Sequence, residues 1–474
     1  MKKFIDRDEE LAALEREYRR DEASLVVVYG RRRVGKTSCL VEFMSGKPSL
    51  YFLATEESEA QNRRAFKDAV AAFARDPLLA SASFEQWDPI FERLAQQQQT
   101  EDRIVLVIDE FQNLGKANPA FPSIMQRIWD TFLSKRNVMV VLCGSLITMM
   151  VAQTLSYSSP LYGRRTAQLR MKQLPFAFYP QFFKPMPLRN LVERYSVTGG
   201  VPKYIELFND DDDDIYKAIA RNVLDRSSFL YDEPNFLLQK EVGEVGTYYS
   251  VIKAIAAGNR KLGNIAAVLE AKQTSLTKYL KALIDLDILE RDVPATEGNP
   301  EKSKKGLYRI KDNFLLFWFR YVFPNLGLIE SGHPDAVMRS IKESFVDGHV
   351  AYVYENVCRD QVWELAAQGT WPFVPERVGR WWGAGDVELD IVALSERERS
   401  ITFGECKFWK APVGANILRD LEEKAAKVGW HSQDRTASFA LFSISGFTEE
   451  LTELASVRPD VLLVGPDDFV LRTG

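Results

Sequence analysis

The feature that most constrains the fold is the stretch LVVVYGRRRVGKT at residues 25–37. Its first residues are apolar and mostly β-branched, which predicts a buried strand, and SCLVEFM after it continues at helical spacing. The spacing GxxxxGKT between them is that of a phosphate loop, in which backbone N–H groups at a helix N-terminus face the phosphates. Lys36 is expected to reach the β and γ phosphates, and Thr37 to hold Mg²⁺. The predicted ATP contacts of this loop are Gly30, Arg31, Arg32, Arg33, Val34, Gly35, Lys36, Thr37 and Ser38.

Two later apolar runs predict strands that end in polar residues. RIVLVIDEF, at 103–111, brings Asp109 and Glu110 to the end of a strand. We expect Asp109 to be a Mg²⁺ partner, and Glu110 to be a catalytic base that polarises the attacking water, as Lys36 polarises the phosphates. NVMVVLCGS, at 137–145, ends in Ser145, which either senses the γ-phosphate or caps a helix.

Strands that alternate with helical stretches predict the fold class. ESEAQNRRAFKDAVAAFA, at 57–74, has helical spacing, and the alternation predicts a parallel sheet in a three-layer α/β/α sandwich. Residues 137–163 carry no charge, but polar residues interrupt the run, so a strand, a turn and a helix are expected there rather than a membrane span.

Length and charge bound the whole chain. At 474 residues it exceeds one hydrophobic core, which predicts a multidomain α/β protein. A formal net charge of −5 is nearly neutral for this size, so any DNA contact must come from local basic patches. The four cysteines show no paired spacing and the first residues are charged, which predicts a cytoplasmic protein without disulfides.

Six stretches, in this order, resemble the archaeal-type ATPase family among the STAND and AAA+ P-loop ATPases: FIDRDEELAAL, VYGRRRVGKT, VIDEFQNL, CGS, SPLYGRRTAQLRM and YSVTGGVPKYI. This resemblance covers residues 1 to about 235 and implies ATP hydrolysis with Mg²⁺. It also implies that residues from Ile5 to Arg7 lie near the adenine, that Arg164 or Arg165 contacts nucleotide or a neighbour, and that the turn ending at Pro202 closes a lid. The residues alone also allow Arg164 to brace a loop, and the turn to be only a helix break.

The middle of the chain has the rhythm of a winged helix-turn-helix. In residues 261–291, NIAAVLE predicts a first helix, QTSLTKYLKALIDLD a second, and the residues up to KGLYRI a β wing. The expected phosphate contacts are Lys272, Lys278, Lys281, Lys302, Lys304 and Lys305, and the residues expected to face bases are Gln273, Thr274 and Ser275. A packing role without DNA stays open, because ALIDLDILE adds acidic residues to the same unit.

Two other segments of unusual composition have ordinary explanations. The aromatic run IKDNFLLFWFRYVFP, at 310–324, predicts a buried helix joining two domains rather than a base-stacking platform. The five aspartates at 210–214 predict a solvated loop that caps the next helix, in preference to a metal site.

A carboxylate-bearing hairpin is predicted near the end of the chain. DVELDIVAL and SITFGECKFW flank ERER, so pairing Ser395 with Ser400 leaves a four-residue loop, and the continued register sets Asp390 opposite Glu405. Opposed side chains have Cβ atoms about 5 Å apart, so two carboxylates there predict a divalent cation between them. Glu405 and Lys407 share one face of their strand, which aims Lys407 at whatever the metal binds.

An Asp followed by Glu-x-Lys on the next strand resembles the PD-(D/E)xK nuclease core of restriction enzymes and Holliday-junction resolvases. Such cores begin with a helix that carries a further glutamate, which AYVYENVCRDQV supplies as Glu355. The resemblance covers residues 335 to 474 and implies a metal site of Glu355, Asp390 and Glu405, holding Mg²⁺ or Mn²⁺, with Lys407 catalytic. Leu389 stands where the nominal motif has proline. The residues also allow an inactive nuclease fold kept for docking.

The predicted domains are residues 1–172 (P-loop ATPase core), 173–235 (helical lid), 236–330 (winged helix-turn-helix and linker helix) and 331–474 (nuclease-like domain). The leading hypothesis is an ATPase that regulates a metal-dependent DNA nuclease. The alternatives are an ATP-switched DNA-binding or signalling protein with a silent nuclease fold, and a remodeller of protein complexes. Each allows a homo-oligomer or a protein partner, and none needs a membrane.

Overall fold

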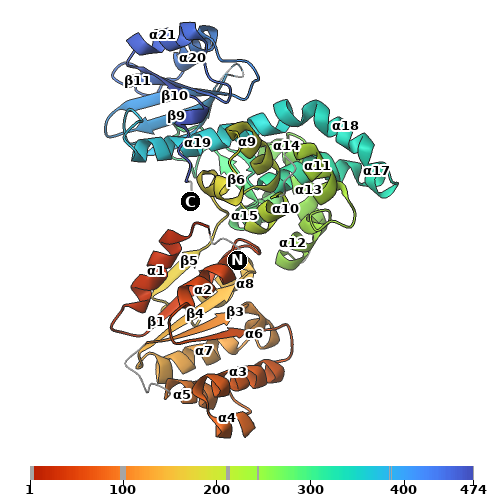
Figure 1. The fold of residues 1–474 in the computed structure, drawn as a ribbon, viewed down its shortest axis with the longest axis vertical. Helices are drawn as coiled ribbons and strands as arrows, with labels where there is room; N and C mark the ends of the chain where they lie inside the picture. Colours follow the sequence, from red (N-terminus) through yellow and green to blue (C-terminus); the bar gives the residue numbers. More distant parts are fainter. Residues whose placement is uncertain are drawn as a thin grey trace. The chain divides into compact units, whose positions relative to one another are not determined.

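The computed structural model describes residues 5–96, 103–209, 214–242, 245–383, 385 and 387–472 (Figure 1). The chain divides into two compact units. The first consists of Met1–Leu174, Val201–Lys203 and Lys240–Gly243, and the second of Pro175–Gly200, Tyr204–Gln239 and Glu244–Gly474. The sequence-based boundaries at 235/236 and 330/331 both fall inside the second unit.

The first unit is built on a five-stranded parallel sheet, as the alternating pattern predicts. The strand order is β2-β3-β4-β1-β5, so β4 lies between the strand that leads into the phosphate loop and the strand that ends in Asp109. The strands are β1 (Ser24–Tyr29), β2 (Ser49–Leu53), β3 (Ile104–Asp109), β4 (Val138–Gly144) and β5 (Ala167–Arg170).

Helices cover both faces of this sheet (Figure 1). On one face, Leu14, Leu40 and Phe43 pack with the side chains of Val26 and Val141 in a single hydrophobic cluster. On the other face, aromatic rings meet, and Phe66 contacts Phe52 of β2 with ring centroids 5.1 Å apart. The helices are α1 (Asp8–Tyr18), α2 (Lys36–Met44), α3 (Glu59–Ala74), α4 (Pro77–Ser81), α5 (Asp88–Ala95), α6 (Gln112–Ala117), α7 (Phe121–Ile128) and α8 (Ile147–Met150).

The uncharged stretch 137–163 forms β4, a turn and α8, which confirms the predicted strand, turn and helix. Within the described residues, none of the helices combines the length and apolar character that crossing a bilayer requires.

The second unit begins with helices and a two-stranded sheet. The helices are α9 (Leu188–Thr198), α10 (Pro202–Leu207), α11 (Ile215–Ile219), α12 (Glu233–Glu241), α13 (Val245–Ala256), α14 (Leu262–Val268), α15 (Gln273–Asp285), α16 (Asn313–Phe317), α17 (Leu326–Glu330) and α18 (Pro334–Phe345). The antiparallel strands are β6 (Leu289–Asp292) and β7 (Leu307–Ile310). The first and last residues of α10 and α12 belong to different units.

The aromatic run at 310–324 is a buried helical segment, as expected. Phe314, Phe317 and Trp318 are fully buried, and the Trp318 indole N–H donates to the carbonyl of Tyr231, 2.8 Å away. In the aspartate run, the Asp214 side chain caps α11 by accepting the backbone N–H of Tyr216. Residues 210–213 lie outside the described part of the chain.

The C-terminal part of the second unit is a mixed sheet of order β12-β11-β10-β9-β8. Helix α19 (Ala351–Ala367) contacts β8, β9 and β10. Leu418 and Leu421 of α20 join the hydrophobic cluster with Val392 and Phe403. The remaining elements are β8 (Arg377–Trp382), β9 (Glu388–Ser395), β10 (Ser400–Lys407), α20 (Ala415–Ala425), β11 (Thr436–Ser443), α21 (Glu449–Val457) and β12 (Val461–Val464).

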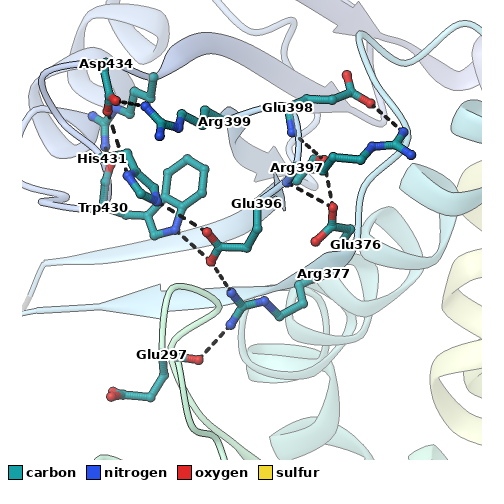
Figure 2. A network of polar contacts seen from close by, with 12 residues as sticks. Glu297, Glu376, Arg377, Glu396, Arg397, Glu398, Arg399, Trp430, His431 and Asp434 are labelled. Carbon is teal, nitrogen blue, oxygen red and sulfur yellow. Dashed lines mark hydrogen bonds and ion pairs between the residues drawn. The ribbon is translucent and has the colours of Figure 1, made fainter.

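The β9–β10 hairpin has the predicted register, with Ser395 paired to Ser400. Figure 2 shows the polar network that fixes its loop: Glu396 accepts from Arg377 at 2.6 Å and from the indole of Trp430 at 3.1 Å. The carboxylate of Glu376 accepts the backbone N–H of Arg397, 3.2 Å away. Because a one-residue slip would turn every side chain to the other face, this network helps to determine which residues of the hairpin face each other.

Candidate active sites

The phosphate loop follows β1 and leads directly into α2. Gly35 is the residue before α2 and has φ 94°, in the left-handed region that favours glycine. A side chain at Gly30 would overlap the backbone carbonyl of Met171, so this glycine allows close approach to the end of β5. The loop therefore depends on both of its motif glycines.

Lys36 is folded back onto the loop that precedes it. Its Nζ donates to the carbonyls of Gly30 and Arg31, both 2.8 Å away. Burial lowers the pKa of this ammonium group, and the charges of Glu110 and Asp109 act in the opposite direction. The ammonium lies at the loop carbonyls, within the site where the motif places phosphates.

Thr37 and Asp109 meet across the site. The Thr37 hydroxyl donates to Oδ2 of Asp109 at 2.9 Å, and the Tyr51 hydroxyl donates to the same oxygen at 2.7 Å. Burial opposes ionisation of Asp109, but hydrogen bonds from Tyr51, Cys143, Thr37 and the Glu110 N–H outweigh it and lower its pKa. The site thus presents a charged carboxylate beside a hydroxyl, both of them oxygen ligands that suit Mg²⁺.

Glu110 is held by the residue at the end of β4. The Ser145 hydroxyl donates to both carboxylate oxygens of Glu110, at 3.0 and 2.8 Å, and the Gln112 amide also donates to Glu110. The residue before α8 is Leu146, and no side chain caps that helix. Of the two expectations for Ser145, a helix cap is wrong; the hydroxyl instead orients the carboxylate expected to act on water.

Arg7 braces the phosphate loop from the N-terminal side. Its guanidinium is buried and donates to the carbonyls of Val34 at 2.8 Å and Lys172 at 2.7 Å, while pairing with Glu10 at 3.0 Å. Ile5 is also buried. A role near the adenine stays a prediction for both residues.

Arg164 and Arg165 precede β5, which runs parallel to β1. They therefore lie at the edge of the sheet where these strands begin, whereas the phosphate loop follows the end of β1 at the opposite edge. Arg164 pairs with Asp130 at 3.0 Å, and Arg165 donates to the carbonyl of Tyr162 at 2.8 Å. The structure therefore does not bring either guanidinium to this chain's own phosphate loop. Pro202 begins α10.

Glu241, at the end of α12, is a residue that sequence reasoning missed. Burial raises its pKa to about 7, against the backbone N–H of Ile147 and the charges of Arg31 and Lys36, which act to lower it. Nothing in the local pattern of α12 distinguishes Glu241, because its neighbours in the first unit are distant in sequence. Tyr51 was missed for the same reason.

A second cluster of charged side chains lies where β9 and β10 diverge. The regular pairing ends at Gly404 and Ile391. Beyond it, Oδ2 of Asp390 accepts the backbone N–H of Cys406 at 2.9 Å. Burial, followed by the charges of Glu355 and Glu405, raises the pKa of Asp390 to about 7. The charges of the two other acids that the sequence grouped with Asp390 thus act on its carboxyl, but a hydrogen bond to the Cys406 N–H replaces the last predicted strand pair.

Lysines surround Glu405 in this cluster. Its Oε1 lies 2.7 Å from Nζ of Lys407, and its Oε2 lies 3.0 Å from Nζ of Lys424 on α20. Burial acts to lower the pKa of Lys407, but Glu405 and Asp390 outweigh it and raise that pKa. An open pocket of about 340 Å³ adjoins the cluster, lined by Glu405, Lys407, Trp409, Ile417, Asp420, Glu423, Lys424 and Lys427.

Lys424 was missed although the sequence carries a signal for it. Asp420, Glu423, Lys424 and Lys427 follow helical spacing, so they form one charged face of α20. Glu355 of α19 pairs with Arg380 of β8. Among the residues that the structure describes, no group of three or more His, Cys, Asp or Glu side chains has the geometry of a metal site.

The polar residues expected to meet DNA are exposed. They lie on α15 and the residue before it and on the β6–β7 connection: Lys272, Gln273, Thr274, Ser275, Lys278, Lys281, Lys302, Lys304 and Lys305. Lys305 pairs with Glu297 at 3.3 Å.

Comparisons with known proteins match both halves of the chain. Residues 4–208 match the family described as an ATPase domain predominantly from Archaea, and residues 318–427 match a family described as archaeal and bacterial proteins of unknown function. Over 469 residues the chain is 38% identical to the uncharacterized protein MJECL04 of Methanocaldococcus jannaschii, covering 98% of this chain and 100% of that protein.

A shorter match and a solved structure agree with this. The uncharacterized ATP-binding protein MJ0423 of the same organism is 48% identical over 44 residues, 9% of this chain and 75% of that protein. The Walker-type ATPase PABY2304 of Pyrococcus abyssi has a TM-score of 0.51 and 19% identity, covering 67% of this chain and 96% of that one. The last likeness concerns the fold.

Proposed function

Since this chain belongs to the archaeal-type ATPase family, we propose that it hydrolyses ATP and that its ATPase cycle regulates a Mg²⁺-dependent DNA nuclease formed by the C-terminal sheet. The observation that carries the nuclease is the cluster of Asp390, Glu405 and Lys407 where β9 and β10 diverge, beside Glu355 of α19.

In the ATPase site, each residue has a distinct task. Lys36 leaves the carbonyls of Gly30 and Arg31 for the β and γ phosphates, and the backbone N–H groups at the start of α2 face the same anion. Glu110, oriented by Ser145, accepts a proton from the attacking water. Thr37 and Asp109 would hold Mg²⁺, which neutralises phosphate charge when bound.

In the C-terminal site, the donor set suits a hard divalent cation. The charges of Glu355 and Glu405 both act on Asp390. Among the described residues these acids do not already have the geometry of a metal site, so they would have to move together to hold Mg²⁺ or Mn²⁺. The bound cation supplies a Lewis acid for the scissile phosphate. Lys407, whose pKa the neighbouring carboxylates raise, stays protonated; its ammonium orients a water and offsets the charge that builds on the phosphate.

The order of elements around this cluster supports the nuclease. A helix with a glutamate, three antiparallel strands, a crossover helix and a parallel strand follow one another as α19, β8, β9, β10, α20 and β11. The PD-(D/E)xK resemblance implies a helix with a glutamate, then a strand with an aspartate and a strand with Glu-x-Lys, and α19, β9 and β10 follow in that order. Helices α14 and α15 and the strands β6 and β7 follow the order of a winged helix-turn-helix, and their exposed lysines suit DNA phosphates.

A second candidate is an ATP-switched DNA-binding protein whose nuclease fold is silent. One observation favours it: Lys407 and Lys424 both pair with Glu405, and Arg380 pairs with Glu355, so cations of the protein already neutralise these two acids. In this alternative the ion pairs are structural, and nucleotide state changes DNA affinity without any cleavage. Both proposals keep the domains predicted from the sequence, at residues 1–172, 173–235, 236–330 and 331–474.

The test is a paired assay of ATP hydrolysis and DNA cleavage with Mg²⁺ and with Mn²⁺, across junction, flap, duplex and single-stranded substrates. We expect both activities in the parent, loss of hydrolysis in Lys36→Ala, and loss of cleavage in Lys407→Ala with hydrolysis retained. Absence of cleavage on every substrate, together with ATP-dependent DNA affinity, would favour the silent alternative.

A further inference from the structure

A basic groove of about 740 Å³ lies within the second unit, away from Glu405 and Lys407. Four parts of the fold form its walls: α14, α15, the β6–β7 hairpin and β8. Lys261 and Gln273 come from the starts of α14 and α15, Lys304 and Tyr308 from the β6–β7 hairpin, and Trp381 and Trp382 from the end of β8. Segments that are more than 100 positions apart in sequence thus present cations and aromatic rings to one space.

The groove is positively charged. Among the described residues that line it there are four cations and no aspartate or glutamate. Lys261 and Lys304 are exposed, and neither forms an ion pair with another residue of the described chain. Arg291, in contrast, donates to the carbonyl of Pro300 at 2.9 Å and so braces the hairpin connection. Two of the groove's lysines are therefore available for an anionic ligand.

Two glycines and a strand irregularity shape the aromatic wall. The β8–β9 pairing shifts register between Gly379 and Trp381, and such a bulge re-aims the side chains that follow it. A side chain at Gly383 would overlap the Trp381 ring, so the glycine leaves room for the indole. Both Trp381 and Trp382 are partly exposed. The wall therefore offers ring surface to a ligand.

A second, smaller pocket of about 20 Å³ shares Trp381 and Trp382 with the groove and is lined in addition by Asp292, Glu388 and Asp390. A space of this size holds about one water molecule, so of the two it is the groove that admits a nucleotide. Cations and exposed rings in one groove are chemistry suited to a polyanion with planar groups.

We propose that this groove binds a single strand of DNA, with its phosphates on Lys261 and Lys304 and its unpaired bases stacked on Trp382 and Tyr308. Ring stacking selects unpaired bases, because the faces of bases in a duplex are already stacked on each other. The proposal rests on the proposed nuclease function, and it specifies a substrate class for it: DNA with a single-stranded segment.

The test is equilibrium binding of a fluorescent oligonucleotide of about 16 nucleotides, and of its duplex, to the full chain in EDTA without nucleotide. EDTA prevents cleavage, so the result is independent of whether the C-terminal site cuts. We expect the parent to bind the single strand at least about tenfold tighter than the duplex, and Trp382→Ala to weaken single-strand binding by about tenfold. Trp382→Phe should restore most of the affinity, because it keeps a ring.

Lys304→Glu provides a second variant. Lys304 is exposed, so this change removes no buried packing, whereas Trp382→Ala removes a partly buried ring. It should weaken binding and reduce the slope of log K against log salt by about one. Trp363→Ala, an exposed tryptophan on α19 outside the groove, and Lys135→Glu, in the first unit, should change nothing. Equal or tighter binding of the duplex by the parent, or unchanged single-strand affinity in both groove variants, would overturn the proposal.

Discussion

The Thr37 hydroxyl at the start of α2 lies 2.9 Å from Oδ2 of Asp109 at the end of β3, although 72 positions separate the two residues. The strand order explains the meeting, because parallel strands bring their carboxyl ends to one edge of the sheet. Tyr51 joins the same carboxylate oxygen from β2. Residues of α2, β2 and β3 thus meet at the Thr37 hydroxyl and the Asp109 carboxylate, the oxygen ligands that we assign to Mg²⁺.

Asp109→Asn should lower Mg²⁺-dependent ATP hydrolysis by about a hundredfold or more, because the amide lacks the charge that the metal needs. Phosphate release at saturating ATP measures the effect. Tyr51→Phe is the matched control: it removes one hydrogen bond to the same oxygen and leaves the carboxylate charged, so its loss should stay below about tenfold. Equal losses in the two variants would show that Asp109 acts only through its hydrogen bonds.

Glu110→Gln should abolish hydrolysis while leaving ATP affinity within about threefold of the parent, because the amide accepts no proton from water. Ser145→Ala should lower kcat by about tenfold with little change in KM, because the hydroxyl only orients Glu110. Single-turnover hydrolysis and binding of a fluorescent ATP analogue separate the two effects. A rise in KM without a fall in kcat for Ser145→Ala would mean that the hydroxyl contacts substrate.

Lys407→Ala and Lys424→Ala should differ, although both lysines pair with Glu405. Removing Lys407 should lower Mg²⁺-dependent cleavage by about a hundredfold or more, because in the proposed mechanism its ammonium offsets the charge that builds on the scissile phosphate. Removing Lys424 of α20 should retain cleavage within about tenfold, because it only shares Glu405. A gel assay with a flap substrate measures cleavage by both variants, and thermal unfolding followed by circular dichroism reports on correct folding of each. If only Lys424→Ala lost cleavage, Lys424 would be the catalytic lysine and Lys407 would only pair with Glu405.

Arg7→Met should destabilise the first unit by about 3 kcal/mol, because the buried carbonyls of Val34 and Lys172 each lose a charged donor. Thermal unfolding followed by circular dichroism measures the loss. Arg19→Ala removes an exposed pair with Glu15 at the other end of α1 and should cost less than about 1 kcal/mol. If the two variants unfold alike, Arg7 does not brace the loop.

His349 should make the second unit sensitive to acid. Burial among aromatic rings, and then the charge of Arg320, lower its pKa from 6.5 to about 3, although its hydrogen bond to the Ser196 carbonyl opposes the shift. Between these values the unfolded chain binds the proton and the folded chain does not. This stabilisation is therefore complete above pH 6.5 and lost as pH falls toward 3, by up to about 5 kcal/mol.

His349→Gln isolates that contribution, because it keeps a donor for Ser196 but cannot take up the proton. Urea unfolding from pH 4 to pH 7 should show a shallower loss of stability in the variant, by up to about 1.4 kcal/mol per pH unit. Comparing the variant with the parent cancels the pH-dependent stability contributions of all other groups. Asp360 is one such group, because burial raises its pKa to about 6 and its contribution has the opposite sign. Parallel pH profiles would contradict the assignment.

Local patterns in the sequence were enough for the elements and for much of each site. The apolar runs that end at Asp109 and Gly144 form neighbouring parallel strands, the uncharged stretch forms β4 and α8, and the hairpin pairs Ser395 with Ser400. These features follow from the periods of strand and helix and from loop length, which neighbouring residues determine.

Only the tertiary structure decided which side chains meet. Arg7 reaches the carbonyl of Val34, Arg164 pairs with Asp130, and Lys424 shares Glu405, and none of these contacts follows from a periodic pattern. Long cationic side chains can reach many partners, so strand order and helix packing select among them. The sequence by itself determined the phosphate loop, the parallel sheet and the face shared by Glu405 and Lys407, because each depends on residues within one or two elements. The partners of those groups came from elements distant in the chain, whose placement depends on packing of the whole unit.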